Sequence, residues 1–107
     1  MSDIFLIQTA VNSPKTAKAI AKQLVKEKYA ACGQVIPRVT SFYWFEGKLE
    51  SGREYLVTLK THRDKLDRAI EEIKAQHPYQ IPEIIVFEID KVDEKYQEWL
   101  LQSLDIK

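Results

Sequence analysis

Four consecutive aromatic residues, Phe42 to Phe45, place the strongest constraint on the fold, because they lie in a stretch of strand-favouring composition. Successive side chains of a strand point to opposite faces, so both faces of this strand carry rings. Each ring needs roughly 150–250 Å² of cover, and a chain of 107 residues is expected to form a single core. The fold therefore has to provide cover on both sides of one strand.

Strand and helix patterns alternate along the whole chain. Strands are recognised by β-branched and aromatic runs, and helices by apolar residues spaced three and four apart. The expected elements are a strand at residues 4–11, a helix from Pro14 through Val25, strands at residues 35–45 and 54–60, a helix at residues 61–76, a strand at residues 83–89 and a short helix after Asp93. This β-α-β-β-α-β order predicts one domain, residues 1–107, with an α+β ferredoxin-like sandwich and a long hairpin.

Local signals refine three of these boundaries. Ser13 is expected to cap the first helix, and residues 61–64 have the form of a capping box for the second helix. Pro37 cannot donate to a sheet ladder, so its strand is expected to be an edge or to carry a bulge. Gly47 and Ser51-Gly52 are expected to bracket the hairpin connection.

The aromatic hairpin predicts self-association. Two helices cover one face of such a sheet, and a short terminal helix is too small to hide all the remaining rings. Other copies of the chain are the simplest cover, and they would also protect the open edge of the hairpin. We therefore expect a homo-oligomer in which ligand sites lie between subunits.

Charge and cysteine content argue against several classes of partner. Sixteen Lys and Arg balance sixteen Asp and Glu, so no net field attracts nucleic acid or an anionic membrane. The Lys/Arg-Gly-aromatic signature of RNA-recognition domains is missing. Cys32 is the only cysteine, the first residues lack a signal-peptide pattern, and no apolar stretch approaches about 18 residues. A cytoplasmic protein without membrane or nucleic-acid partners is expected.

Six short strings occur along the chain in a distinctive order. They are Ala30-Ala31-Cys32, Ile36-Pro37, Thr40 through Lys48, Leu59-Lys60-Thr61, His77-Pro78-Tyr79 with Pro82-Glu83-Ile84, and Tyr96 with Trp99. With this order and spacing the chain resembles the CutA divalent-cation tolerance proteins over nearly its whole length. The resemblance implies a ferredoxin-like subunit in a stable homotrimer, similar in architecture to PII signalling proteins. It also implies clefts between subunits, and a link to divalent-cation tolerance and copper binding.

Copper prefers imidazole and soft sulfur, so Cys32, His62 and His77 are the strong ligands on offer. Some members of the family that the chain resembles carry a cysteine and a second histidine where this chain has Gln8 and Gln76. His77, in a loop fixed by two prolines, is then the predicted metal residue, with Cu(II) as a possible ligand and no cofactor required. The alternatives are a structural hydrogen bond for His77, a buried unreactive thiol for Cys32 and a solvated side chain for His62.

The predicted ligand-binding residues combine an aromatic wall, carboxylates and one ammonium, which together suit a small polar molecule between subunits. They are Cys32, Trp44, Glu46, Lys60, Tyr79 and Glu83. An interfacial ion pair with a glutamate is the alternative for Lys60. No catalytic motif is present, so we expect a binding or regulatory protein rather than an enzyme. Two other functions stay open: an enzyme acting on a small polar substrate in the same cleft, with Glu46 and Glu83 as acid and base, and a structural scaffold for partners.

Overall fold

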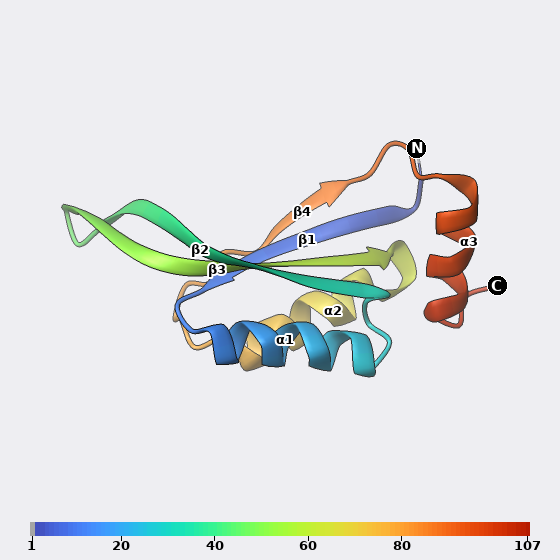
Figure 1. Cartoon of the computed structure of the whole chain (residues 1–107), viewed down its shortest axis with the longest axis horizontal. Coiled ribbons are helices and arrows are strands. Elements are labelled where there is room, and N and C mark those ends of the chain that lie inside the picture. Colours follow the sequence, from blue (N-terminus) through green and yellow to red (C-terminus); the bar gives the residue numbers. More distant parts are fainter. Residues whose placement is uncertain (1) are drawn as a thin grey trace.

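Four strands and three helices make up residues 2–107, the part of the chain that this computed structural model describes (Figure 1). They are β1 (Ile4–Val11), α1 (Pro14–Lys26), β2 (Cys32–Phe45), β3 (Lys48–His62), α2 (Arg63–Gln76), β4 (Ile85–Glu88) and α3 (Glu94–Ser103). The predicted α+β ferredoxin-like order is confirmed. Within residues 2–107, no helix is long and apolar enough to span a bilayer.

The strands form one antiparallel sheet in the order β2-β3-β1-β4. Figure 1 shows α1 and α2 side by side on one face, while α3 lies at the end of the sheet far from the hairpin tip. Ile7 of β1 lies opposite Leu59 of β3, and both are fully buried against the two helices. The opposite face of the sheet, which we call the open face, has no helix across it in Figure 1.

The core between the sheet and the helices follows from the apolar spacing of α1. Its residues Ala17, Ile20, Ala21 and Leu24 are buried. The predicted cap is confirmed, because the Ser13 side chain accepts a hydrogen bond from the Thr16 N–H at 3.3 Å. The helix approaches β2 closely at Gly33, where an added Cβ would lie 3.1 Å from Leu59 Cδ2 and 3.2 Å from Ala21 Cβ.

The capping box predicted for α2 is wrong. The helix begins one residue later than that motif requires, and His62 is its N-cap, with Nδ1 accepting from the Asp64 N–H at 3.0 Å. Thr61 is instead fully buried, and its hydroxyl donates to the Tyr29 carbonyl at 2.6 Å. The sequence pattern could not reveal this, because the tertiary contact with Tyr29 takes the hydroxyl that the motif assigns to the cap.

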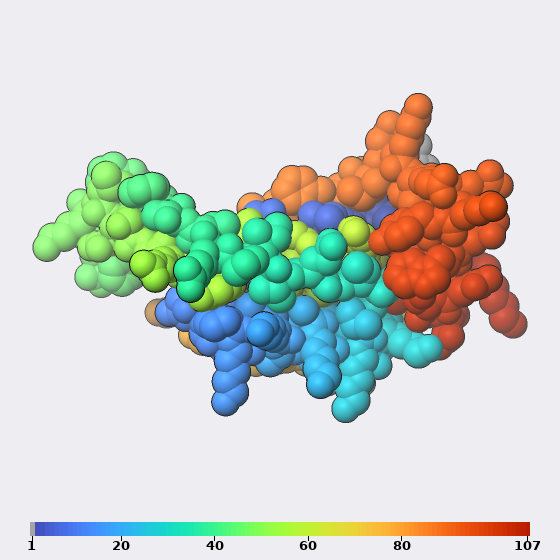
Figure 2. All heavy atoms as spheres, in the orientation of Figure 1, coloured from blue at the N-terminus to red at the C-terminus, as the bar shows by residue number. Residues whose placement is uncertain are grey.

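The hairpin formed by β2 and β3 extends beyond the body of the domain (Figures 1 and 2). Its turn is Glu46-Gly47, with φ of 49° and 79°, so residues 51 and 52 belong to β3 rather than to the connection expected there. The predicted edge strand and bulge are both confirmed, because β2 is an edge and its register shifts between Ile36 and Val39. The molecule is elongated: its radius of gyration is 14.5 Å, against about 13 Å for a compact chain of this length.

Candidate functional site

The open face of the sheet carries two of the side chains that the sequence singled out, Cys32 and Lys60. Paired residues of antiparallel strands share a face, and the side chains alternate with the buried ones. Leu6 lies opposite Lys60 and Phe87, and Cys32 lies opposite Lys60. The open face is therefore partly apolar, with a lysine near one end.

A cavity of about 280 Å³ lies where α3 meets this open face, and we call it the α3 pocket. Lys60 lines it, and its Nζ donates to Tyr96 Oη and to Gln34 Oε1, each at 3.4 Å. The same Nζ lies 5.6 Å from the centroid of the Tyr96 ring. Because Gln34 belongs to β2, Lys60 to β3 and Tyr96 to α3, three elements position this ammonium.

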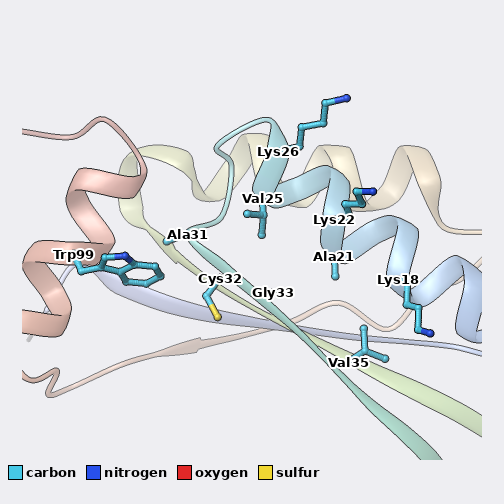
Figure 3. A pocket seen from close by; sticks show the side chains of 10 residues that line it. All are labelled: Lys18, Ala21, Lys22, Val25, Lys26, Ala31, Cys32, Gly33, Val35 and Trp99. Atoms are coloured by element: carbon cyan, nitrogen blue, oxygen red, sulfur yellow. The ribbon is translucent and has the colours of Figure 1, made fainter.

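A second, larger cavity of about 650 Å³ runs along α1 and the edge strand β2, and we call it the α1 groove (Figure 3). Three lysines of α1, Lys18, Lys22 and Lys26, line one side, and Trp99 of α3 lies at one end (Figure 3). Cys32 also lines the groove, and Figure 3 shows its thiol directed away from α1. Cys32 forms no disulfide and is half-buried. It lies at the boundary between this groove and the open face, because it lines the groove and pairs with Lys60.

His77 is buried and uses both ring nitrogens. Nδ1 accepts from the Tyr79 N–H at 3.1 Å, which leaves Nε2 as the protonated nitrogen that donates to the Ala10 carbonyl at 2.9 Å. A metal ion would have to displace one of these bonds. Among residues 2–107, moreover, no three side chains of the His, Cys, Asp or Glu type cluster closely enough to hold a metal. These residues do not fit a copper site built from one chain.

Tyr79 links the loop after α2 to the hairpin. Its hydroxyl donates to Glu54 Oε2 on β3 at 3.0 Å, and its ring meets the His77 ring edge-on at 4.7 Å between centroids. Burial of the phenol, and then the neighbouring Glu54 carboxylate, raise the pKa of Tyr79 well above its ordinary value. Glu83, from the same loop, is exposed and accepts from Gln8 Nε2 at 2.9 Å.

Trp44 and Glu46 lie at the tip of the hairpin, where Trp44 pairs with Leu49 and is 75% exposed. Lys60 lies far along β3 from Leu49, at a distance of about 36 Å at roughly 3.3 Å a residue. One chain therefore divides the predicted ligand-binding residues among three places: the hairpin tip, the Tyr79 loop and the α3 end. Trp44 and Lys60 can share a site only if they come from different subunits.

Two residues at the α3 end, Gln34 and Tyr96, were absent from the predicted set of ligand-binding residues. Strand alternation gives a signal for Gln34, because it follows Cys32 by two residues and so falls on the face of Lys60. Tyr96 belongs to the strings that carry the family resemblance, but the sequence does not pair it with Lys60, because only the docking of α3 against the end of the sheet brings the two together.

Comparison with known proteins gives one consistent result. Residues 5–103 match the profile of a family described as CutA1 divalent ion tolerance protein. "Protein CutA 1, chloroplastic" of rice is 37% identical over 98 residues, which cover 92% of this chain and 55% of the relative. "Divalent-cation tolerance protein CutA" of Thermus thermophilus is 36% identical over 103 residues, which cover 96% of this chain and 98% of the relative.

A solved structure shows the same likeness in three dimensions. The "Periplasmic divalent cation tolerance protein CutA" of Archaeoglobus fulgidus superposes with a TM-score of 0.90 at 32% identity, covering 94% of this chain and 98% of that one. The chain spans about half the length of the rice relative and nearly all of the bacterial and archaeal ones. None of these four descriptions names an enzymatic activity.

Proposed function

The chain belongs to the CutA1 divalent ion tolerance family, and from this membership we propose that it acts as a homotrimeric, cytoplasmic binding or regulatory protein with ligand clefts between its subunits. The observation that carries the proposal is the sheet itself. One face is packed against α1 and α2, whereas the open face and the aromatic hairpin lack such cover in one chain.

The exposed surface supports association. A monomeric protein of 12.5 kDa is expected to expose about 6,200 Å², whereas this chain exposes 7289 Å². The excess of about 1,100 Å² includes large apolar side chains, with Phe42 72%, Trp44 75% and Leu49 64% exposed on the hairpin. On the open face, Phe87 is 44% exposed. Such surface is stable in water mainly when other chains cover it.

The two edges of the sheet offer a way to associate. Pairing β4 of one subunit with β2 of the next is a head-to-tail contact, which can close into a ring. Three lysines of α1 line the groove beside β2, whereas Glu88 belongs to β4 and Glu83 precedes it. The charges at the two edges are thus complementary. Closure after three subunits is the state that the family resemblance implies.

The proposed cytoplasmic location rests on the cysteine content, because the single Cys32 cannot form a disulfide within the chain. The rice relative is described as chloroplastic and the Archaeoglobus relative as periplasmic. Membership of the family therefore does not fix the compartment.

Light scattering at micromolar concentration tests the trimer. We expect a mass three times the 12.5 kDa of one chain. Phe87→Asp, on the open face, should reduce the mass because it introduces a carboxylate where another subunit is proposed to pack. Lys74→Asp introduces the same group at an exposed position of α2, away from the open face, and should leave the mass unchanged. A single-chain mass for the unaltered protein would overturn the proposal.

A further inference from the structure

The geometry points to the α3 pocket as a binding site for a small organic carboxylate. This inference rests on the proposed function, because other subunits of the oligomer complete the cleft around the pocket. The first observation is the set of partners of Lys60. The residue as a whole is half-buried, and the two hydrogen-bond acceptors of its ammonium, Gln34 and Tyr96, are both neutral and both at 3.4 Å. Along residues 2–107, no carboxylate lies within the 4.0 Å of an ion pair with it.

A cation with long, neutral hydrogen-bond partners favours an anion. A charge-assisted hydrogen bond is roughly twice as strong as a neutral one, so a carboxylate is a better acceptor for the Lys60 ammonium than the Gln34 amide or the Tyr96 hydroxyl. The Asp93 carboxylate also lines the pocket, but it caps α3, where its Oδ2 accepts a hydrogen bond from the Tyr96 N–H at 3.2 Å. Lys91 adds a second cation to the lining. The charge balance of the pocket is therefore positive.

The walls of the pocket define the rest of the ligand. Five aliphatic side chains line it, namely Ile4, Leu6, Ile89, Val92 and Leu100. Its volume of about 280 Å³ is that of about nine water molecules, which is below the usual range of drug-sized sites. A nucleotide is too large for such a volume, whereas a short aliphatic acid places its carboxylate at Lys60 and its chain against Leu6 and Leu100. The Tyr96 hydroxyl, which now accepts from Lys60, is free to donate to the same carboxylate.

Nuclear magnetic resonance of the intact, isotopically labelled oligomer tests this site with three probes. Butyrate has the predicted chemistry, butyramide lacks the charge, and inorganic phosphate has charge without an apolar body. We expect butyrate alone to shift the amide signals of α3 and of residues around Lys60. Lys60→Gln should weaken butyrate binding about tenfold or more, since it removes a charge-assisted bond. Lys95→Gln, the same change on α3 outside the pocket lining, should bind as the unaltered protein does.

Tyr96→Phe provides a second variant, because it retains the ring and removes only the hydroxyl. We expect it to weaken butyrate binding less than Lys60→Gln does, with the oligomer mass unchanged. A trimer in which butyrate shifts no signals overturns the carboxylate site and leaves the proposed function standing. Equal shifts with butyramide, or shifts with phosphate alone, overturn the predicted ligand class. If Lys60→Gln lowers the mass of the oligomer, Lys60 forms an interfacial ion pair and the carboxylate site is overturned. If the unaltered protein is a monomer, the proposed function is overturned instead.

Discussion

His77 and Tyr79, in the loop after α2, connect that loop to the sheet, although the sequence predicted a metal-binding role for His77 and a ligand-binding role for Tyr79. Tyr79 and His77 stack edge-on, and each is hydrogen-bonded to another segment of the chain, Tyr79 to β3 and His77 to β1. The two prolines of this loop favoured a presented His77, whereas its ring is buried and both ring nitrogens are hydrogen-bonded within the domain, which is the structural alternative. These contacts hold the loop after α2 against the base of the hairpin.

Tyr79 should make stability depend on pH in the alkaline range. Its pKa in the folded chain is raised above 10.0, so above pH 10 the unfolded chain loses this proton before the folded chain does. The stabilisation from Tyr79 is therefore fully present below pH 10 and declines as the pH rises above it. Tyr79→Phe should lower the free energy of unfolding by about 1 kcal/mol at pH 7, because it removes one bond to a carboxylate, and the gap should narrow above pH 10.

Denaturant unfolding at pH 7 and at several values above pH 10 measures this gap. Glu54→Gln keeps an acceptor for the phenol but removes its charge, so the alkaline dependence should become smaller without vanishing, since burial is the larger cause of the shift. A gap between the unaltered protein and Tyr79→Phe that stays constant across this range would contradict the assignment.

His77 should not govern copper affinity in this chain. Both of its ring nitrogens are engaged, and Gln8 and Gln76 stand where some relatives are expected to carry further ligands. Calorimetry with Cu(II) should therefore give the same affinity for the unaltered protein and for His77→Gln, whose amide can still donate to the Ala10 carbonyl. Loss of copper binding in a folded His77→Gln protein would restore His77 as the metal residue.

At the scale of elements, the hairpin separates residues that the sequence grouped together. Its turn, Glu46-Gly47, has positive φ at both positions, as a two-residue type I′ turn requires. The bulge before it places Arg38 at φ 59°, next to Pro37. Glu46 is thus at a strained position for an ordinary residue, and it lies at the hairpin tip, remote from Lys60.

Glu46→Asn separates the local role of this residue from any role in binding. Asparagine tolerates positive φ better than glutamate, and Asn-Gly is the preferred type I′ pair, so the free energy of unfolding should rise by roughly 0.5–1 kcal/mol. Denaturant unfolding measures this gain. Glu50→Asn, an exposed position on β3, is the control and should lower stability slightly, because asparagine is a poor strand former. A loss of stability in Glu46→Asn would contradict the assigned turn.

At the scale of the whole molecule, one chain is elongated and has no helix across one face of its sheet. It is 48 Å long and 25 Å by 22 Å across, with the hairpin tip at one end and α3 at the other. Its predicted ligand-binding residues are spread along this length. An assembly that covers the open face is the arrangement in which the hairpin residues of one subunit can approach the α3 end of another.

The sequence by itself determined the elements and their order. Apolar spacing, Ser13-Pro14 and Pro37 act over a few residues, so they predict a capped helix and a bulged edge strand without knowledge of the fold. The tertiary structure alone decided how far apart the predicted ligand-binding side chains lie, because these distances depend on strand register and on how α3 docks. It also assigned Thr61 to Tyr29 rather than to the helix cap, and brought Tyr96 to Lys60, since hydrogen bonds between distant segments leave no local pattern.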